Sequence, residues 1–169
     1  SFTGIRVGVA AVRGFALAAA RPAVSVTSLE ALASEGRVLR PGRPILAVLD
    51  ARKGEVYAQT FDAAGRPLDT AVVAPAVAIA AAGSARGAVA IGSGAPLLAA
   101  VEPRLEVATA TAFPAIDTIA RLALPRLAAA APGRDPPAPL YVRPPDAKPQ
   151  TAARLARLTP DGHHAEVPT

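Results

Sequence analysis

The fold is decided by the stretch Ile45-Leu46-Ala47-Val48-Leu49-Asp50-Ala51-Arg52-Lys53-Gly54-Glu55-Val56-Tyr57-Ala58-Gln59-Thr60-Phe61. Residues 45–49 form a continuous apolar run, which is typical of a central strand buried on both faces. Residues 55–61 alternate between the two faces, as a partly exposed strand does. The segment 51–54 between them suits a tight turn, so the two strands are predicted to form an antiparallel hairpin.

Strand and helix signals continue downstream of the hairpin. A turn at 62–65 precedes a third strand at 68–73 and a short helix at 75–82, which Gly83 is expected to end. The remaining expected elements are strands at 88–91 and 105–108, and helices at 95–101 and 114–130, the last distorted by Pro125. A three-stranded meander followed by crossover units predicts the ribonuclease-H-like module that actin-like proteins contain twice.

The segment before the hairpin matches the end of such a module. Residues 4–20 predict a mostly apolar helix, residues 24–26 a short strand, and residues 29–34 a brief helix capped by Thr27 or Ser28. Segment 35–44 combines glycine, proline and arginine and predicts a surface connection. We therefore expect a duplicated actin-like α/β fold with three parts: residues 1–36 as the remnant of a truncated first repeat, residues 37–143 as a complete second repeat, and residues 144–169 as a flexible tail.

Composition excludes several functional classes. The chain of 169 residues has no cysteine, which excludes disulfides, thiolate metal sites and cysteine nucleophiles. Its only histidines, His163 and His164, lie in the tail, so we expect no histidine triad and no metal site in the body of the chain. Arg13 and Arg21 interrupt the first apolar stretch, and no membrane span is expected. A cytoplasmic location fits these features.

The charge balance is basic but dispersed. Lysine and arginine total 18 residues against 13 aspartate and glutamate, for a formal net charge of +5. The basic residues are almost all arginines spread singly along the chain, and the few aromatic residues are too scattered to form a base-stacking platform. An RNA-binding module that uses the arginines stays open as one alternative, and the other interpretation of the arginines is a compositional bias.

Four blocks in the chain are distinctive in combination. They read Ser-Phe-Thr-Gly-Ile-Arg-Val-Gly (1–8), Val-Thr-Ser-Leu-Glu-Ala-Leu-Ala (26–33), Leu-Asp-Ala-Arg-Lys-Gly-Glu-Val-Tyr (49–57) and Pro-Leu-Tyr-Val-Arg (139–143). In this order and spacing they resemble the TsaB (YeaZ-type) family of the bacterial tRNA threonylcarbamoyladenosine machinery. In that family the first block follows Gly-Pro-Gly, which is the reason for expecting a truncated start.

The resemblance implies an accessory role without intrinsic enzymatic activity. TsaB-type proteins are dimerisation and activating subunits that bind TsaD, the subunit that transfers threonylcarbamoyl to the adenosine next to the anticodon. The partners implied are therefore a TsaD-type subunit, a TsaE-type ATPase and a second copy of the chain, with tRNA as the substrate of the complex. No intrinsic cofactor is implied, and ATP or ADP is expected only in the complex.

The first helix is the candidate partner interface. Its small residues would let another helix approach closely, while its larger apolar residues would pack at the contact. The alternative is that this helix packs against its own missing subdomain. The residues expected at the interface are Phe2, Thr3, Gly4, Arg6, Val7, Gly8, Ala11 and Phe15.

Two turns are further candidates. Gly92-Ser93-Gly94 follows a strand and opens a helix, a geometry that can hold a phosphate but is equally an ordinary strand-to-helix connection. It is our candidate nucleotide contact, and a small actin-like ATPase or kinase fragment is the corresponding alternative function. The hairpin turn is a candidate recognition turn for acidic groups, with Asp50, Arg52, Lys53 and Glu55 as its residues. The competing interpretation is that Asp50 accepts hydrogen bonds from the turn and that Glu55 pairs with Arg52.

Overall fold

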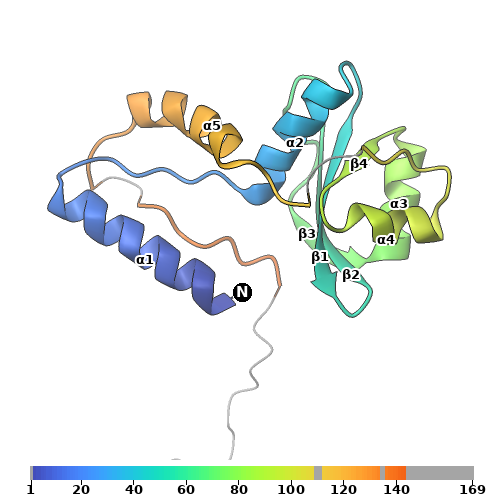
Figure 1. Cartoon of the computed structure of the whole chain (residues 1–169), viewed down its shortest axis with the longest axis horizontal. Coiled ribbons are helices and arrows are strands. Elements are labelled where there is room, and N and C mark those ends of the chain that lie inside the picture. The colour runs from blue at the N-terminus through green and yellow to red at the C-terminus, as the bar shows by residue number, and fades with distance from the viewer. Residues whose placement is uncertain (1, 109–111, 134–135, 144–169) are drawn as a thin grey trace, which may run out of the picture.

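A computed structural model of the chain describes residues 2–108, 112–133 and 136–143. Its centre is a mixed four-stranded sheet with helices on both faces (Figure 1). The strands are β1 (Ile45–Arg52), β2 (Glu55–Phe61), β3 (Val72–Pro75) and β4 (Val89–Ile91), in the order β3-β2-β1-β4. The helices are α1 (Phe2–Ala18), α2 (Ser28–Leu39), α3 (Ala76–Ala85), α4 (Ala95–Val101) and α5 (Ile116–Ala129).

The predicted hairpin is confirmed. β1 and β2 pair antiparallel from Ile45↔Phe61 to Arg52↔Glu55, with an irregularity between Asp50 and Arg52. Alternate residues of β1 face two separate cores, because successive side chains of a strand point to opposite faces. Leu46 and the β1 residues on the same face as Leu46 pack with α3 and α4. Ile45 and the β1 residues on the opposite face pack with α2. Burial on both faces explains why the sequence of β1 is continuously apolar rather than alternating.

The parallel part of the sheet is shorter than predicted. β4 pairs parallel to β1 from Ile45↔Val89 to Ala47↔Ile91, which confirms one crossover through α3. The expected strand at 105–108 is reduced to a single parallel bridge, Ala90↔Val107. Two hydrogen bonds hold this bridge: Ala90 donates to the carbonyl of Glu106, and Ala108 donates to the carbonyl of Ala90. Residues 109–111 lie outside the described part of the chain.

Helix α2 corrects the prediction for residues 35–39. A capping box starts the helix, in which the Thr27 side chain accepts from the Glu30 N–H and the Glu30 side chain accepts from the Thr27 N–H. The helix then continues to Leu39 instead of giving way to a surface connection after residue 34. Gly36 does not end the helix, because its missing side chain admits Ile45: a Cβ there would lie 2.8 Å from Ile45 Cγ2.

Three other local predictions are wrong. Residues 24–26 form no strand, and the carbonyl of Ser25 instead accepts a hydrogen bond from Arg126. The third strand begins at Val72 rather than residue 68, because Asp69 turns inward to accept the N–H of Thr60. Gly83 lies inside α3 rather than after it, and a Cβ there would lie 2.6 Å from Leu46 Cδ2. In the last case close packing against the sheet outweighs the low helix propensity of glycine.

The outer helices differ in how firmly they are attached. α5 runs through Pro125, as the sequence predicts, and its Arg126 forms an ion pair of 2.8 Å with Glu30 of α2. α1 stands away from the sheet in Figure 1 and exposes large apolar side chains, with Phe15 76% and Leu17 82% exposed. Within the described ranges, no helix has both the length and the apolar character needed to cross a membrane. The expected tail, with His163 and His164, lies outside those ranges.

The Glu30–Arg126 pair makes the attachment of α5 sensitive to acid. Partial burial favours the neutral form of Glu30, but hydrogen bonds from Arg126 and Thr27 and the charge of Arg126 outweigh it, so the pKa of Glu30 lies below its ordinary 4.5. The unfolded chain therefore binds more protons than the folded chain in this range. The stability contributed by Glu30 is complete above the ordinary pKa and is lost as the pH falls through the lowered one.

The direction of this pH dependence gives a measurable prediction for Glu30→Gln. The variant should have a smaller free energy of unfolding than the parent at about pH 7, and the difference should shrink towards about pH 3, measured by urea denaturation. Asp62 and Glu106 also have lowered pKa values, so the parent alone will lose stability in acid for several reasons. Only the difference in the free energy of unfolding between the parent and the variant measures the contribution of Glu30. A difference that stays constant with pH would contradict a lowered pKa of Glu30 in the folded chain.

Candidate functional site

Two of the predicted turns meet at the carboxyl end of β1. The backbone N–H of Asp50 donates to Ser93 Oγ over 3.2 Å, and the N–H of Gly94 donates to the carbonyl of Val48 over 3.2 Å. The candidate recognition turn and the candidate nucleotide turn are therefore in direct contact, although they are about forty residues apart in the sequence. Strand pairing between β1 and β4 brings them together, since each turn follows its strand at the same edge of the sheet.

The hairpin turn holds its basic residues in an uncommon backbone conformation. Arg52 and Lys53 have φ angles of 68° and 54°, and Gly54 follows with 77°. A left-handed conformation costs a non-glycine residue about 1–2 kcal/mol. Asp50 stabilises it, since Asp50 Oδ1 accepts the Arg52 N–H at 2.7 Å, which is the turn role that the competing interpretation predicted. The side chain of Arg52 is 87% exposed as a result.

The partner of Glu55 differs from the prediction. Glu55 pairs with Arg143 and not with Arg52. The same guanidinium donates to the carbonyl of Ala51 over 3.2 Å and lies 5.7 Å from the centre of the Tyr57 ring. Arg143 is 88 residues from Glu55 in the sequence, so no local spacing signals the contact. Its place in the block 139–143 was the sole indication of importance.

The Gly92-Ser93-Gly94 turn is packed tightly on β1. Gly92 has a φ of 109°, and a Cβ there would lie 2.2 Å from the carbonyl oxygen of Val48. A Cβ on Gly94 would lie 2.8 Å from Val48 Cγ1. The Ser93 hydroxyl already accepts the Asp50 N–H. The turn therefore serves the close packing of the β4–α4 connection against β1, and α4 itself spans only seven residues.

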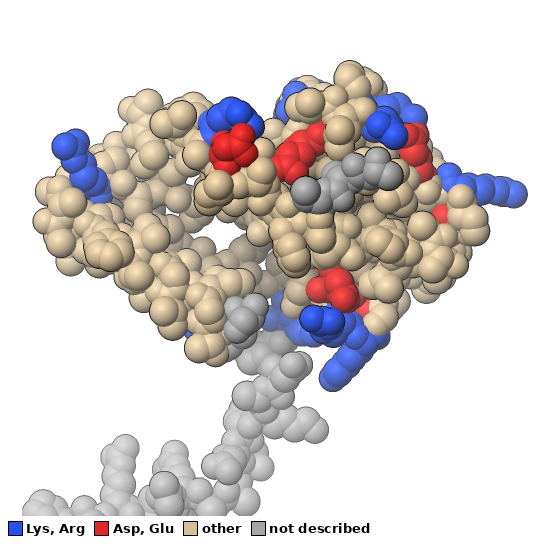
Figure 2. Space-filling view, viewed as in Figure 1, with Lys and Arg blue, Asp and Glu red and all other residues tan. Residues whose placement is uncertain are grey.

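The predicted interface residues of α1 are exposed. This holds for Thr3, Gly4, Arg6, Val7, Gly8, Ala11 and Phe15, while the side chain of Phe2 lies outside the described part of the structure. The surface over α1 is largely uncharged in Figure 2, whereas charged side chains gather over the sheet. Near the start of the helix, Arg6 Nε donates to the Tyr141 hydroxyl over 2.9 Å. A Cβ on Gly8 would meet nothing within 4 Å.

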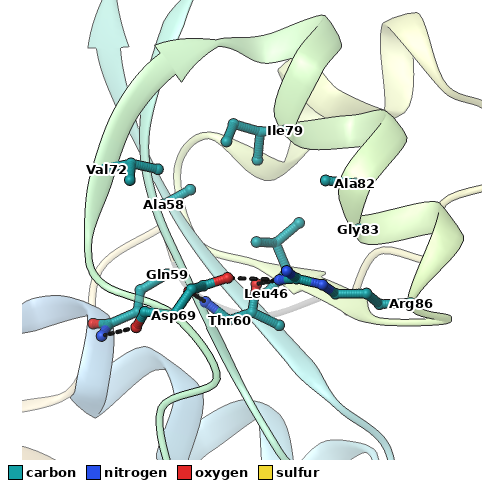
Figure 3. Close-up of a pocket in the computed structure, with 10 residues that line it drawn as sticks. All are labelled: Leu46, Ala58, Gln59, Thr60, Asp69, Val72, Ile79, Ala82, Gly83 and Arg86. Carbon is teal, nitrogen blue, oxygen red and sulfur yellow. Dashed lines mark hydrogen bonds and ion pairs between the residues drawn. The ribbon is translucent and has the colours of Figure 1, made fainter.

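A cavity of about 100 Å³ lies between α3 and the sheet, lined by residues of β1, β2 and β3 (Figure 3). Arg86 reaches across it to Asp69 Oδ2 at 2.6 Å and Thr60 Oγ1 at 3.1 Å. Asp69 Oδ1 in turn accepts the N–H of Thr60. This volume is well below the roughly 300 Å³ of the smallest usual ligand pockets, so the cavity cannot hold a nucleotide. The polar network instead closes the contact between α3 and the sheet edge.

Comparison with known proteins identifies the relatives of this fold. A family model described as "TsaD: tRNA N6-adenosine threonylcarbamoyltransferase" matches residues 1–125. The chain belongs to this TsaD family. Two curated relatives, from Escherichia coli (strain K12) and Haemophilus influenzae, are both named "tRNA threonylcarbamoyladenosine biosynthesis protein TsaB". They are 40% and 39% identical over 57 residues, which cover 34% of this chain and 25% and 24% of the relatives.

Solved structures indicate which type of TsaD-family protein this chain resembles. A protein from Pseudomonas aeruginosa with similarity to peptidase YEAZ superposes with a TM-score of 0.64 at 26% identity, over 85% of this chain and 69% of that one. YeaZ from Pseudomonas aeruginosa superposes with a TM-score of 0.57 at 23% identity, over 75% and 62%, and so supports the fold alone. The curated relatives and the first of these structures make the chain a TsaB/YeaZ-type member of the family. The matched segment spans about a quarter of the curated relatives.

Among the described residues, no group of three or more histidine, cysteine, aspartate or glutamate side chains is arranged to hold a metal ion. The chemically active side chains near the carboxyl end of β1 are Asp50, Glu55 and Arg143, and each is engaged by the fold. The molecule therefore presents a packed turn cluster at the carboxyl end of β1 and, apart from it, an exposed apolar helix, α1.

Proposed function

We propose that the chain is an accessory subunit in tRNA threonylcarbamoyladenosine biosynthesis, and that it acts by binding a TsaD-type subunit rather than by catalysis. The observation that carries the proposal is α1, whose apolar side chains are exposed in a chain of TsaB/YeaZ type. Exposed apolar patches of this kind mark protein interaction sites. The proposed contact residues are those named above, from Phe2 to Phe15.

The geometry of α1 favours a helical partner. Gly4, Gly8, Ala11 and Phe15 are spaced three or four residues apart, so they share one face of the helix. The small residues allow a partner helix to approach closely, and Phe15 supplies an apolar anchor. Val7 lies beside this face, whereas Arg6, two residues or about 200° from Gly8, lies on the opposite side of the helix. A second copy of the chain could use the same face, which makes homodimerisation the natural competitor of TsaD binding.

The proposal extends to the fold and the remaining partners. The sheet order and the crossover through α3 support assignment of residues 37–143 to one ribonuclease-H-like repeat of an actin-like fold, although α2 (Ser28–Leu39) also packs on this sheet. A TsaE-type ATPase and tRNA are further proposed components of the complex, with the Asp50–Glu55 turn as a proposed recognition element. We propose no intrinsic nucleotide site, because Gly92 and Gly94 are needed for packing on β1. Any ATP or ADP would then bind only in the complex.

A titration tests this function. The full chain is added to a TsaD-type subunit, and both binding and threonylcarbamoyladenosine formation on tRNA are measured. We expect saturable binding and product formation that depends on both proteins. ATP turnover by the chain alone would instead support an actin-like ATPase. Tight, salt-sensitive binding of tRNA by the chain alone would support an RNA-binding module that uses Arg52 and Lys53.

A further inference from the structure

The segment 139–143 contacts two separate parts of the molecule within three residues. Tyr141 meets α1: its hydroxyl accepts from Arg6 Nε over 2.9 Å, and the Arg6 guanidinium carbon lies 5.4 Å from the centre of its ring. Arg143 meets the β1–β2 hairpin at Ala51 and Glu55. In Figure 1 this segment runs along α1 towards the lower tip of the hairpin.

The Arg143 contact is the stronger of the two. Its side chain is 26% exposed, and it combines a charge-assisted hydrogen bond to Glu55, a second bond to the carbonyl of Ala51 and a position over the Tyr57 ring. Charge-assisted bonds are about twice as strong as neutral ones, and a cation over an aromatic ring adds a further attraction. A planar guanidinium can make these contacts together, and a lysine cannot.

The position of α1 needs such support. Residues 19–27 connect α1 to α2 without a helix or strand beyond the turn at 19–20, and the large apolar residues of α1 are exposed rather than packed on the sheet. We infer that Tyr141 and Arg143 form a strap that fixes the orientation of α1 relative to the β1–β2 hairpin. The strap is a property of the chain alone, and only its consequence for a partner rests on the proposed function.

The strap has a direct consequence for binding. A helix whose orientation is set before docking does not lose that freedom on docking, so its apparent affinity is higher. If α1 samples several orientations without the strap, the apparent affinity falls in proportion to the fraction that is competent to bind. Arg143 and Tyr141 are thus positioning residues that act through α1, and they need not touch the partner.

Spin labels can test the strap directly, because the chain has no cysteine of its own. The labels are attached through Arg13→Cys on α1 and Ala63→Cys after β2, both at exposed positions, and pulsed electron paramagnetic resonance measures the distance between them. We expect Arg143→Ala to broaden this distance distribution, with circular dichroism and melting close to the parent. The matched control is Arg121→Ala, which removes an arginine paired with Asp117 on α5 and should leave the distribution unchanged.

A second variant keeps the test decisive if Arg143→Ala does not fold. Tyr141→Phe removes only the hydroxyl that accepts from Arg6, and a smaller broadening is expected. A distribution that stays unchanged in every folded strap variant, or that broadens equally in Arg121→Ala, would overturn the strap. TsaD-type binding should weaken about three- to tenfold in Arg143→Ala. Unchanged affinity beside a broadened distribution would contradict docking through α1 and leave the strap supported.

Discussion

Gly8→Leu should weaken binding to a TsaD-type subunit by about 100-fold, or about 2.7 kcal/mol, without destabilising the chain. The reason is that Gly8 lies on the small-residue face of α1, where added bulk would hold a partner helix away. In the free chain a Cβ at this position meets nothing within 4 Å. Leucine also favours a helix over glycine by about 0.8 kcal/mol, so the melting temperature should stay the same or rise.

The matched control is Ala10→Leu. Ala10 is exposed on the same helix but lies two residues, or about 200°, around it from Gly8. The Ala10→Leu variant therefore carries similar bulk on a different face of α1, and its affinity for the TsaD-type subunit should match that of the parent. Isothermal titration with both variants checks the prediction. Equal losses in the two variants, or parental affinity in Gly8→Leu, would mean that this face of α1 is not where the partner docks.

Gly92→Ala should lower the free energy of unfolding by about 3–5 kcal/mol and the melting temperature by about 10 °C. A Cβ there would lie 2.2 Å from the Val48 carbonyl oxygen and 2.8 Å from Leu32 Cδ1. The Leu32 side chain has some freedom, but Val48 belongs to the central strand and cannot shift without disturbing its pairing with Ala58. The φ of 109° adds strain that any L-side chain would carry.

Gly87→Ala separates the two causes. Gly87 also has a positive φ, of 59°, but a Cβ there meets nothing within 4 Å, so only the backbone strain of about 1–2 kcal/mol applies. Urea denaturation without nucleotide compares the two variants. Equal losses would show that close approach to Val48 is unimportant. The presence of glycine at position 92 would then need another explanation, and phosphate binding by this turn would be the first one to test.

Local patterns predicted those elements whose partners lie nearby in the sequence. The β1–β2 hairpin follows from the apolar run 45–49 and the turn at 51–54, and helix α4 was predicted at its observed bounds, Ala95–Val101. The capping box at Thr27 and Glu30 is a local signal too, and it starts α2 where expected. In each case the stabilising contact joins residues only a few positions apart.

Glycine has roles in α2 and α3 that differ from those the local sequence predicts. Gly36 was predicted to lie in a surface connection and Gly83 to end a helix, yet both lie within helices and contact side chains of β1. The sequence alone does not distinguish a glycine that ends a helix from a glycine that leaves space for a neighbouring side chain. What distinguishes them is the position of Ile45 and Leu46, which is known only once the sheet is assembled.

The sequence by itself determined the family, the hairpin and the apolar character of α1. Only the tertiary structure decided that Glu55 pairs with Arg143, that Tyr141 meets Arg6, and that the Gly92 turn packs on Val48. The physical reason is separation along the chain: these contacts join residues between 44 and 135 positions apart. No periodicity spans such distances, because the partners become neighbours only through the pairing of strands and the path of residues 136–143.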